Sequence, residues 1–257
     1  MTLATFNVNS IRARLPVLTK WLTETNPDVV ALQETKVEDA KFPIAEIESA
    51  GYHVSFHGQP RYNGVALLSK APIDSTLTGF EDPEWPTDCR IIAAQIGEVY
   101  VVNTYAPNGT AVGSEKYEYK LAWFEKLHDL LYDRLKDHEN LVWLGDINVA
   151  PTDLDVFDPK KMAAEVCFTS REKDALKKLV DLGLTDCFRK FEQGGGHYSY
   201  WEYFIPNSFQ RNLGWRIDHI YATKALADTC TGCEIDLEPR RWERPSDHTP
   251  VVASFDI

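Results

Sequence analysis

Two short apolar segments that end abruptly in an acid limit most strongly how this chain can fold. Each follows a predicted helix, and they read Val29-Val-Ala-Leu-Gln-Glu34 and Leu141-Val-Trp-Leu-Gly-Asp146. A short apolar run that stops at a charge is typical of a buried strand whose last side chain leaves the core for a cleft. The two segments therefore indicate a faint internal duplication.

The order of the remaining elements predicts the fold class. Apolar residues spaced by three or four positions predict helices over Arg14–Glu24, Ser114–Lys136 and Arg171–Leu182, and Pro27 stops the first of them. Short β-type runs predict strands over residues 2–8, 28–33, 54–57, 64–69, 91–96, 99–105, 215–222 and 249–255. This order indicates an α/β protein with two packed, mainly antiparallel sheets flanked by helices. No linker interrupts the sequence, so residues 1–257 are expected to form a single domain.

Charge and composition exclude several classes of protein. The 27 basic and 39 acidic residues give a net charge of −12, which argues against a protein that coats nucleic acid. Local potential decides binding, however, and a cation held by carboxylates reverses the field where a phosphate would lie. No apolar stretch exceeds about five residues, far short of a membrane span. The first residues lack the features of a secretory signal, so a cytoplasmic location is expected.

The five cysteines, at positions 89, 167, 187, 230 and 233, are expected to be free thiols because they are few and odd in number. Cys230 and Cys233 have the spacing of a zinc or redox pair. No second pair accompanies them, so a metal or redox role is the less favoured interpretation.

Polar side chains at the ends of five apolar strands form the candidate site. They are Asn7, Glu34, Asp146, Asn148, Asp218, Asp247 and His248. Oxygen ligands with one imidazole suit a hard cation such as Mg²⁺ or Mn²⁺, whereas zinc prefers more His or Cys. Taken singly, each residue would more often be a cap or a turn residue.

Together these segments resemble the exonuclease III-type AP endonucleases. The resemblance rests on Pro27-Asp-Val-Val-Ala-Leu-Gln-Glu-Thr-Lys36, Asp186-Cys-Phe-Arg-Lys190, Tyr198-Ser-Tyr-Trp201 and Asn212-Leu-Gly-Trp-Arg-Ile-Asp-His219. It implies a four-layer α/β sandwich and divalent-metal-dependent phosphodiester hydrolysis in base excision repair. The implied reactions are cleavage of duplex DNA 5′ to an abasic site, 3′–5′ exonuclease action and 3′-end cleaning.

The same resemblance implies the roles of the site residues. It places Asn7, Glu34, Asp146, Asn148, Asp247 and His248 around a Mg²⁺ ion, with Mn²⁺ as a substitute. Asp146 would take the proton from the attacking water, and Asn148 would orient that water or the phosphate. His248, oriented by Asp218, would stabilise charge on the phosphate, which Tyr105 would also contact.

DNA contacts are implied for five further residues. Arg90 and Asn108 would contact the DNA backbone, while Tyr200, Trp215 and Ile217 would line a pocket for the base-free sugar. For Ile217 an ordinary core position is equally expected from strand alternation. The implied partner is duplex DNA with an abasic or 3′-blocked site, bound by a monomer away from any membrane. Local basic residues are expected to support binding, namely Arg12, Lys36, Arg61, Arg90, Arg189, Lys190 and Arg216.

Three positions depart from the family pattern. Ser10 replaces a usual Gly, Cys187 replaces Ser or Thr, and Ala111 leaves the loop after Asn108 without an arginine. The first two are expected to be tolerated packing changes. The third is expected to affect how tightly the protein holds the nicked DNA product.

Two alternatives stay open from the residues. Pancreatic-type deoxyribonucleases, inositol-polyphosphate 5-phosphatases and bacterial sphingomyelinases use a similar set of Glu, Asp-x-Asn and Ser-Asp-His. The Leu-Gln-Glu-Thr-Lys segment at residues 32–36 favours DNA repair. A non-catalytic binding module is disfavoured because every catalytic position is filled.

Overall fold

Twelve strands form two six-stranded sheets in the computed structural model, which describes residues 1–86 and 88–257. The first sheet has the order β11 (Cys230–Ile235), β12 (Val251–Phe255), β1 (Thr2–Asn7), β2 (Val29–Gln33), β4 (Val65–Ser69) and β3 (His53–His57). The second has the order β5 (Asp74–Thr78), β6 (Ile91–Ile96), β7 (Val99–Tyr105), β8 (Leu141–Asp146), β10 (Asp218–Thr223) and β9 (Leu184–Asp186).

Each sheet contains one parallel pair at its centre. These pairs are β1 with β2 and β7 with β8, and the other neighbours are antiparallel. A long helix connects each parallel pair, α1 (Ile11–Thr25) in the first sheet and α3 (Glu115–Asp137) in the second. The internal duplication seen in the sequence is therefore a repeated strand-helix-strand unit.

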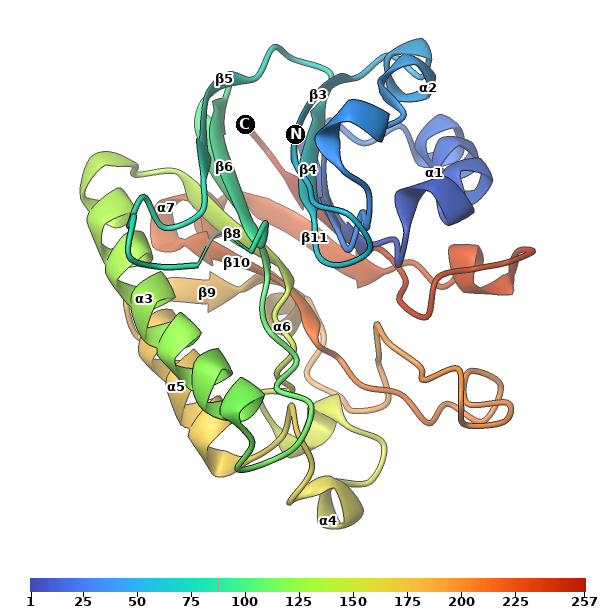
Figure 1. Cartoon of the computed structure of the whole chain (residues 1–257), viewed down its shortest axis with the longest axis vertical. Helices are drawn as coiled ribbons and strands as arrows, with labels where there is room; N and C mark the ends of the chain where they lie inside the picture. Colours follow the sequence, from blue (N-terminus) through green and yellow to red (C-terminus); the bar gives the residue numbers. More distant parts are fainter. Residues whose placement is uncertain (87) are drawn as a thin grey trace.

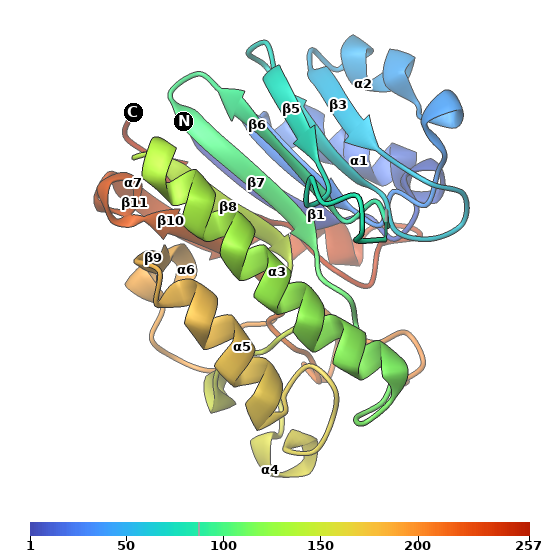
Figure 2. The ribbon, with the colours of Figure 1, turned by 60° about the vertical axis from the view of Figure 1, so that its left-hand side comes forward.

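Helices cover the outer face of each sheet and complete four layers. Figure 1 shows α1 and α2 (Ile44–Ser49) beside the first sheet, and Figure 2 shows α3 and α5 (Ser170–Val180) against the second. Shorter helices are α4 (Pro159–Met162), α6 (Cys187–Phe191) and α7 (Lys224–Asp228), with single 3₁₀ turns at Asp39–Lys41, Asp153–Asp155 and Glu238–Arg241. The arrangement confirms the expected α/β sandwich of two mainly antiparallel sheets.

The alternation of side chains explains the continuous apolar strands. In β8, Val142 and Leu144 face the core between the two sheets. Leu141 and Trp143 face the opposite way, into the core beneath α3 and α5. Because both faces of the strand are covered, its sequence is apolar at every position until Gly145 and Asp146.

Several elements differ from the sequence expectation. Helix α1 begins at Ile11 rather than Arg14 and contains Pro16. Strand β10 begins at Asp218, because Trp215 forms only isolated bridges with Val156 and Tyr200. The sequence analysis missed the edge strands β5, β9 and β11 and the short helices.

All five cysteines are free and buried, as expected. Over the described residues, the helices are too short or too polar for any of them to cross a membrane.

Candidate active site

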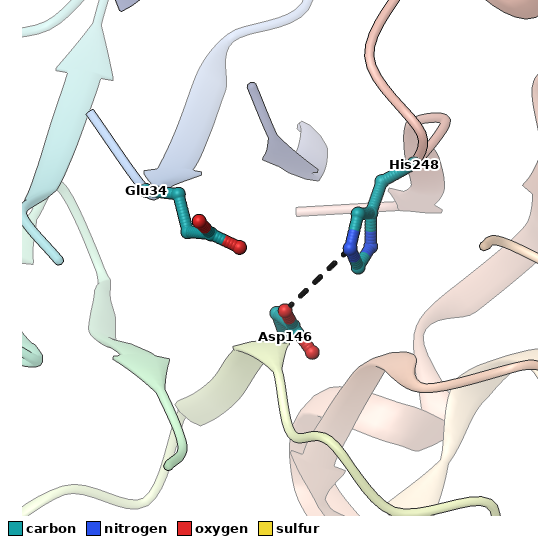
Figure 3. Close-up of side chains that lie close together, drawn as sticks. All are labelled: Glu34, Asp146 and His248. Carbon is teal, nitrogen blue, oxygen red and sulfur yellow. Dashed lines mark ion pairs between the residues drawn. The ribbon is translucent and has the colours of Figure 1, made fainter. Parts of the chain in front are cut away.

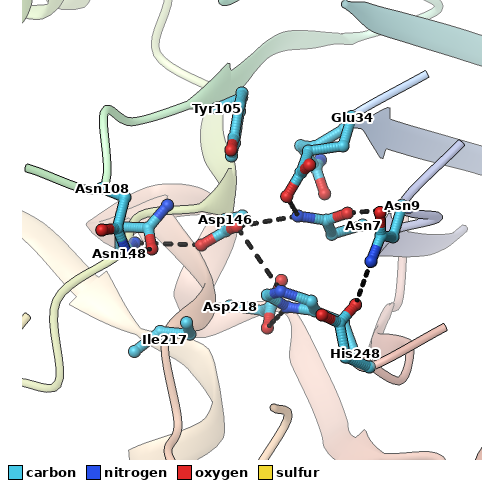
Figure 4. A network of polar contacts seen from close by, with 12 residues as sticks. Asn7, Asn9, Glu34, Tyr105, Asn108, Asp146, Asn148, Ile217, Asp218 and His248 are labelled. Carbon is cyan, nitrogen blue, oxygen red and sulfur yellow. Dashed lines mark hydrogen bonds and ion pairs between the residues drawn. The ribbon is translucent and has the colours of Figure 1, made fainter. Parts of the chain in front are cut away.

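The polar residues meet at one edge of the sandwich. Strand register places Asp146 opposite Tyr105 on one side and opposite Asp218 on the other. Asp218 begins its strand rather than ending it, and His248 lies in the loop before β12, contrary to the expectation of strand ends. Because the start of an antiparallel strand lies beside the end of its neighbour, both residues still reach the same edge. Glu34, after β2 of the other sheet, faces them (Figure 4).

Glu34, Asp146 and His248 form the compact centre of this edge. One ligand atom from each lies within 4.8 Å of the others (Figure 3). Asn7 Nδ2 donates to Glu34 Oε1 and to Asp146 Oδ2, both at 2.8 Å. Lys36 Nζ lies 2.5 Å from the other Glu34 oxygen, so Glu34 already has a positive partner.

The donor set fits a divalent cation. The carboxylates of Glu34, Asp146, Asp218 and Asp247 gather here, whereas Lys36 and His248 are the cations paired with the carboxylates of this centre. This excess of negative charge, with oxygen donors, is the chemistry that holds a hard cation. Within this group, Glu34 and Asp146 are the two carboxylates close enough to share one ion.

The oxygen atoms of the other three residues expected around the metal accept hydrogen bonds from neighbouring asparagines. Asn7 turns its amide nitrogen toward the carboxylates, and its oxygen accepts the Asn9 N–H at 2.9 Å. Asp247 Oδ1 accepts from Asn9 Nδ2 at 2.9 Å, and Asn148 Oδ1 accepts from Asn108 Nδ2 at 3.3 Å. Their roles as ligands stay predictions.

His248 is held by Asp218 in one orientation. Its Nδ1 lies 2.8 Å from Asp218 Oδ2, which also accepts the Ser199 hydroxyl at 2.6 Å. The other ring nitrogen, Nε2, lies 3.8 Å from Asp146 Oδ2. Asp218 therefore fixes the proton on Nδ1 and directs Nε2 toward the reacting edge.

The buried charges shift the pKa values of this cluster. Burial raises the pKa of Asp146 to about 8; Asp218 and Glu34 add to the rise and His248 opposes it. Burial lowers the pKa of His248, but Asp218 and Asp146 outweigh it and raise the pKa to about 10. Burial likewise opposes ionisation of Glu34, yet Lys36 and Asn7 leave its pKa lowered. His248 is therefore a cation at neutral pH, and Asp146, once ionised, is a stronger base than an ordinary carboxylate.

Asn148, Asn108 and Tyr105 surround Asp146. Asn148 donates its main-chain N–H to Asp146 Oδ1 at 3.0 Å and its side-chain amide to Ala106 O at 3.0 Å. Burial and the charges of Glu34 and Asp146 raise the pKa of Tyr105 far above its usual value, so its phenol stays protonated. Arg90 packs over the Tyr105 ring at 4.7 Å and forms an ion pair with Asp88 at 2.8 Å.

A cleft of about 700 Å³ opens beside the cluster. It is lined by most of the residues expected to act on DNA, including Glu34, Tyr105, Asn108, Asp146, Asn148, Tyr200, Trp215, Ile217, Asp247 and His248, while Arg90 is not among them. Tyr200 and Trp215 are half-buried, whereas Ile217 is 4% exposed and packs in an apolar cluster with Phe168. Ala111 lies on the rim, in the loop after Asn108.

Several basic residues expected to bind DNA have structural partners. Arg216 is 1% exposed and forms ion pairs with Asp155 and Asp186, so the expectation of a DNA contact there is wrong. Arg189 also pairs with Asp155, and Lys190 donates to main-chain carbonyls. The exposed candidates are Arg12, Arg61 and Lys190.

Sequence reasoning missed two residues that orient the site. Ser199 donates to Asp218, and Asn9 connects Asn7 with Asp247. Ser199 lies inside the segment Tyr198-Ser-Tyr-Trp201, and Asn9 lies two residues after the candidate ligand Asn7. These positions are the signal that could have identified them.

The comparisons with known proteins agree with this geometry. The sequence model of the Endonuclease/Exonuclease/phosphatase family matches residues 4–248. Exodeoxyribonuclease III of Haemophilus influenzae is 35% identical over 99% of this chain and 100% of its own length. An AP endonuclease from Archaeoglobus fulgidus superposes with a TM-score of 0.97 at 43% identity, covering 100% of both chains. The 3′ phosphatase NExo from Neisseria, bound to a product DNA hairpin, gives 0.96 at 40% identity, also covering 100% of both.

Proposed function

The chain belongs to the Endonuclease/Exonuclease/phosphatase family and is a metal-dependent DNA repair nuclease, and from this premise we propose that it incises duplex DNA on the 5′ side of abasic sites. We propose that the same centre removes nucleotides and blocking groups from 3′ ends. The observation that carries the proposal is the meeting of Asp146, the His248–Asp218 pair and Glu34 at one cleft.

Each group has a distinct task in phosphodiester hydrolysis. A divalent cation bound at Glu34 and Asp146 would neutralise phosphate charge and favour departure of the 3′ oxygen. Asp146, which is oriented by a hydrogen bond from the Asn148 N–H, accepts the proton of the attacking water. His248 donates from Nε2 to the phosphate oxygens, whose negative charge grows in the transition state. The phosphorus–O3′ bond then breaks, and the leaving oxygen takes up a proton from solvent to give a 3′-hydroxyl.

Recognition of the missing base is assigned to the half-buried aromatic wall of the cleft. Tyr200 forms isolated bridges with Trp215 and with His248, and the Tyr200 and His248 rings are 4.7 Å apart. A flipped-out deoxyribose without its base is compact and partly apolar, so a tight slot accepts it and excludes an intact nucleotide. Because one chain carries every group used here, we propose a monomer whose residues 1–257 act as a single domain.

A labelled duplex with one abasic analogue tests the activity. We expect incision with Mg²⁺ or Mn²⁺, a 3′-hydroxyl product, and no incision in EDTA. Equal cleavage in chelator would contradict the metal assignment. Hydrolysis of inositol phosphates without cleavage of DNA would favour a phosphatase of the same fold.

Binding of Mn²⁺ measured by calorimetry tests the metal site without an activity assay. The Glu34→Gln variant should bind the ion at least tenfold more weakly, because it loses a carboxylate ligand. The matched control is Glu24→Gln, an exposed helix residue paired with Lys20, which should bind as the wild type does.

A further inference from the structure

Lys120 of α3 and Glu172 of α5 form a buried ion pair that lies outside the chemistry described so far. Both side chains have 0% exposure, and Lys120 Nζ lies 2.5 Å from Glu172 Oε1. Removing two charges from water is unfavourable unless further hydrogen bonds compensate. Further hydrogen-bond partners are therefore expected around both charged groups.

The ammonium group holds two loops of the active site. Lys120 Nζ donates to the main-chain oxygen of Asn148 at 2.7 Å and to that of Asn108 at 3.1 Å. With Glu172 as the third acceptor, its three N–H bonds each have an oxygen partner. One point charge thus connects the loop after β7 with the loop after β8.

Glu172 fixes the position of this ammonium. Its Oε1 also accepts the Cys167 N–H at 2.9 Å, and its Oε2 accepts the main-chain N–H and hydroxyl of Thr169 at 3.1 and 2.7 Å. The bond from the Thr169 N–H is one half of the capping box at the start of α5, and the Glu172 N–H donating to the Thr169 hydroxyl is the other. The N-terminus of α5 therefore fixes Glu172, and Glu172 in turn fixes the ammonium group of Lys120.

The two loops present the amides that border Asp146. Asn148 has a φ of 53°, in the left-handed region, so its backbone needs support from its surroundings. Its side chain is joined to that of Asn108 at 3.3 Å, in the wall of the cleft. A shift of either carbonyl would move both amides relative to the phosphate.

We propose that Lys120 is a positioning residue that, clamped by Glu172, holds Asn108 and Asn148 in their catalytic geometry. This inference rests on the proposed function, in which the Asn148 N–H orients Asp146, and on the roles that the family resemblance implies, namely Asn148 on the water or phosphate and Asn108 on the DNA backbone. The two carboxylates proposed to bind the metal are held by strands, because Glu34 follows β2 of the other sheet and Asp146 ends β8 between β7 and β10. Metal binding is therefore expected to change much less than kcat when Lys120 is replaced.

The double variant Lys120→Met/Glu172→Gln removes both charges together and leaves no unpaired buried ion. For incision of the abasic duplex at 20 °C we expect kcat to fall at least tenfold, with KM and Mn²⁺ affinity within twofold. Lys126→Met on the same helix, whose partner Asp82 is near the surface, is the matched control and should behave as wild type. A double variant with lowered thermal stability and unchanged kcat would overturn the proposal.

A thermodynamic cycle separates positioning from general loosening. If Lys120 acts through the side-chain amides of Asn108 and Asn148, the double variant should lower kcat by less than twofold in an Asn108→Ala/Asn148→Ala background. A full tenfold loss in that background would contradict the proposal. If the double variant does not fold, Lys120→Arg replaces the ammonium group by a planar guanidinium group. A wild-type kcat in that variant would overturn the proposal. A loss of kcat that disappears in the same alanine background would support it.

The wild-type enzyme in the same assay distinguishes the two hypotheses. An inactive wild type on abasic duplex would contradict the proposed function, and the cycle would then be measured on 3′-end degradation of plain duplex. An active wild type with equally active variants would contradict this inference alone.

Discussion

The imidazole of His248 depends on one buried carboxylate for its charge and orientation. Asp218 holds Nδ1 at 2.8 Å and raises the pKa of the ring, and it is itself fixed by the Ser199 hydroxyl. The second Asp218 oxygen has no hydrogen-bond partner among the residues that the structure describes. The two side chains are therefore expected to act as one unit.

His248→Ala and Asp218→Ala should each lower kcat by about 10²–10⁴-fold, because each removes the same stabilisation of the transition state. The double variant should lose little more than either single variant. Circular dichroism and single-turnover kinetics check folding and rate. Losses that simply add in free energy would show that the residues act independently.

Trp215 and Ile217 offer a matched test of the sugar pocket. Trp215→Ala should narrow the rate ratio between abasic and intact duplex, because it opens the half-buried wall of the cleft. Ile217→Ala should instead lower stability by about 2–5 kcal/mol, because it leaves a cavity in the cluster around Phe168. Urea unfolding and rates on both duplexes distinguish the two. A Trp215 variant that is destabilised but fully selective would place the pocket elsewhere.

At the scale of elements, the sequence predicts those strands whose apolar run is closed at both ends by turn or charged residues. Strands β6, β7 and β8 have the predicted ends because turn or charged residues interrupt each apolar run. Strand β11 escaped detection because it is an edge strand with the sequence Cys-Thr-Gly-Cys-Glu-Ile and a register shift. The His248–Asp218 pair was predictable from the family resemblance, and the acids at the ends of strands were predictable from the apolar runs before them. The Lys120–Glu172 pair was not. Two charged residues 52 positions apart carry no local signal that they will be buried together.

The parallel pair β7–β8 depends on Gly145 for its close approach. This residue has a φ of 143°, and a Cβ atom there would lie 1.9 Å from Thr104 O. Gly145→Ala should therefore cost at least about 2 kcal/mol of stability and lower activity, since Asp146 follows directly. Gly232→Ala on edge strand β11, where nothing lies within 4 Å, is the control. Urea midpoints measure both, and equal midpoints would mean that the strands separate without strain.

Across the whole molecule, acidic charge is balanced locally. The net charge is −12, yet Asp155 is fully buried between Arg216 and Arg189, joining the 3₁₀ turn at Asp153–Asp155 to α6 and to the segment before β10. Burial opposes its ionisation, but Arg216, Thr152 and Arg189 outweigh burial and lower the pKa of Asp155 to about 2. None of these three side chains lines the cleft, so their network stabilises the fold rather than the surface that meets DNA.

The lowered pKa of Asp155 predicts part of the acid stability of the fold. A carboxyl group whose pKa is lower when folded than when unfolded stabilises the protein above the unfolded pKa, and that contribution disappears as pH falls toward the folded value. For Asp155 the window runs from about pH 4 to about pH 2. The contribution is about 2 kcal/mol at neutral pH, of which about 1 kcal/mol is lost by pH 3. Asp155→Asn should therefore be less stable at pH 7, with the difference from wild type shrinking between pH 5 and pH 3. Urea unfolding across this range checks it, and a difference that stays constant would show that Asp155 is not the titrating group.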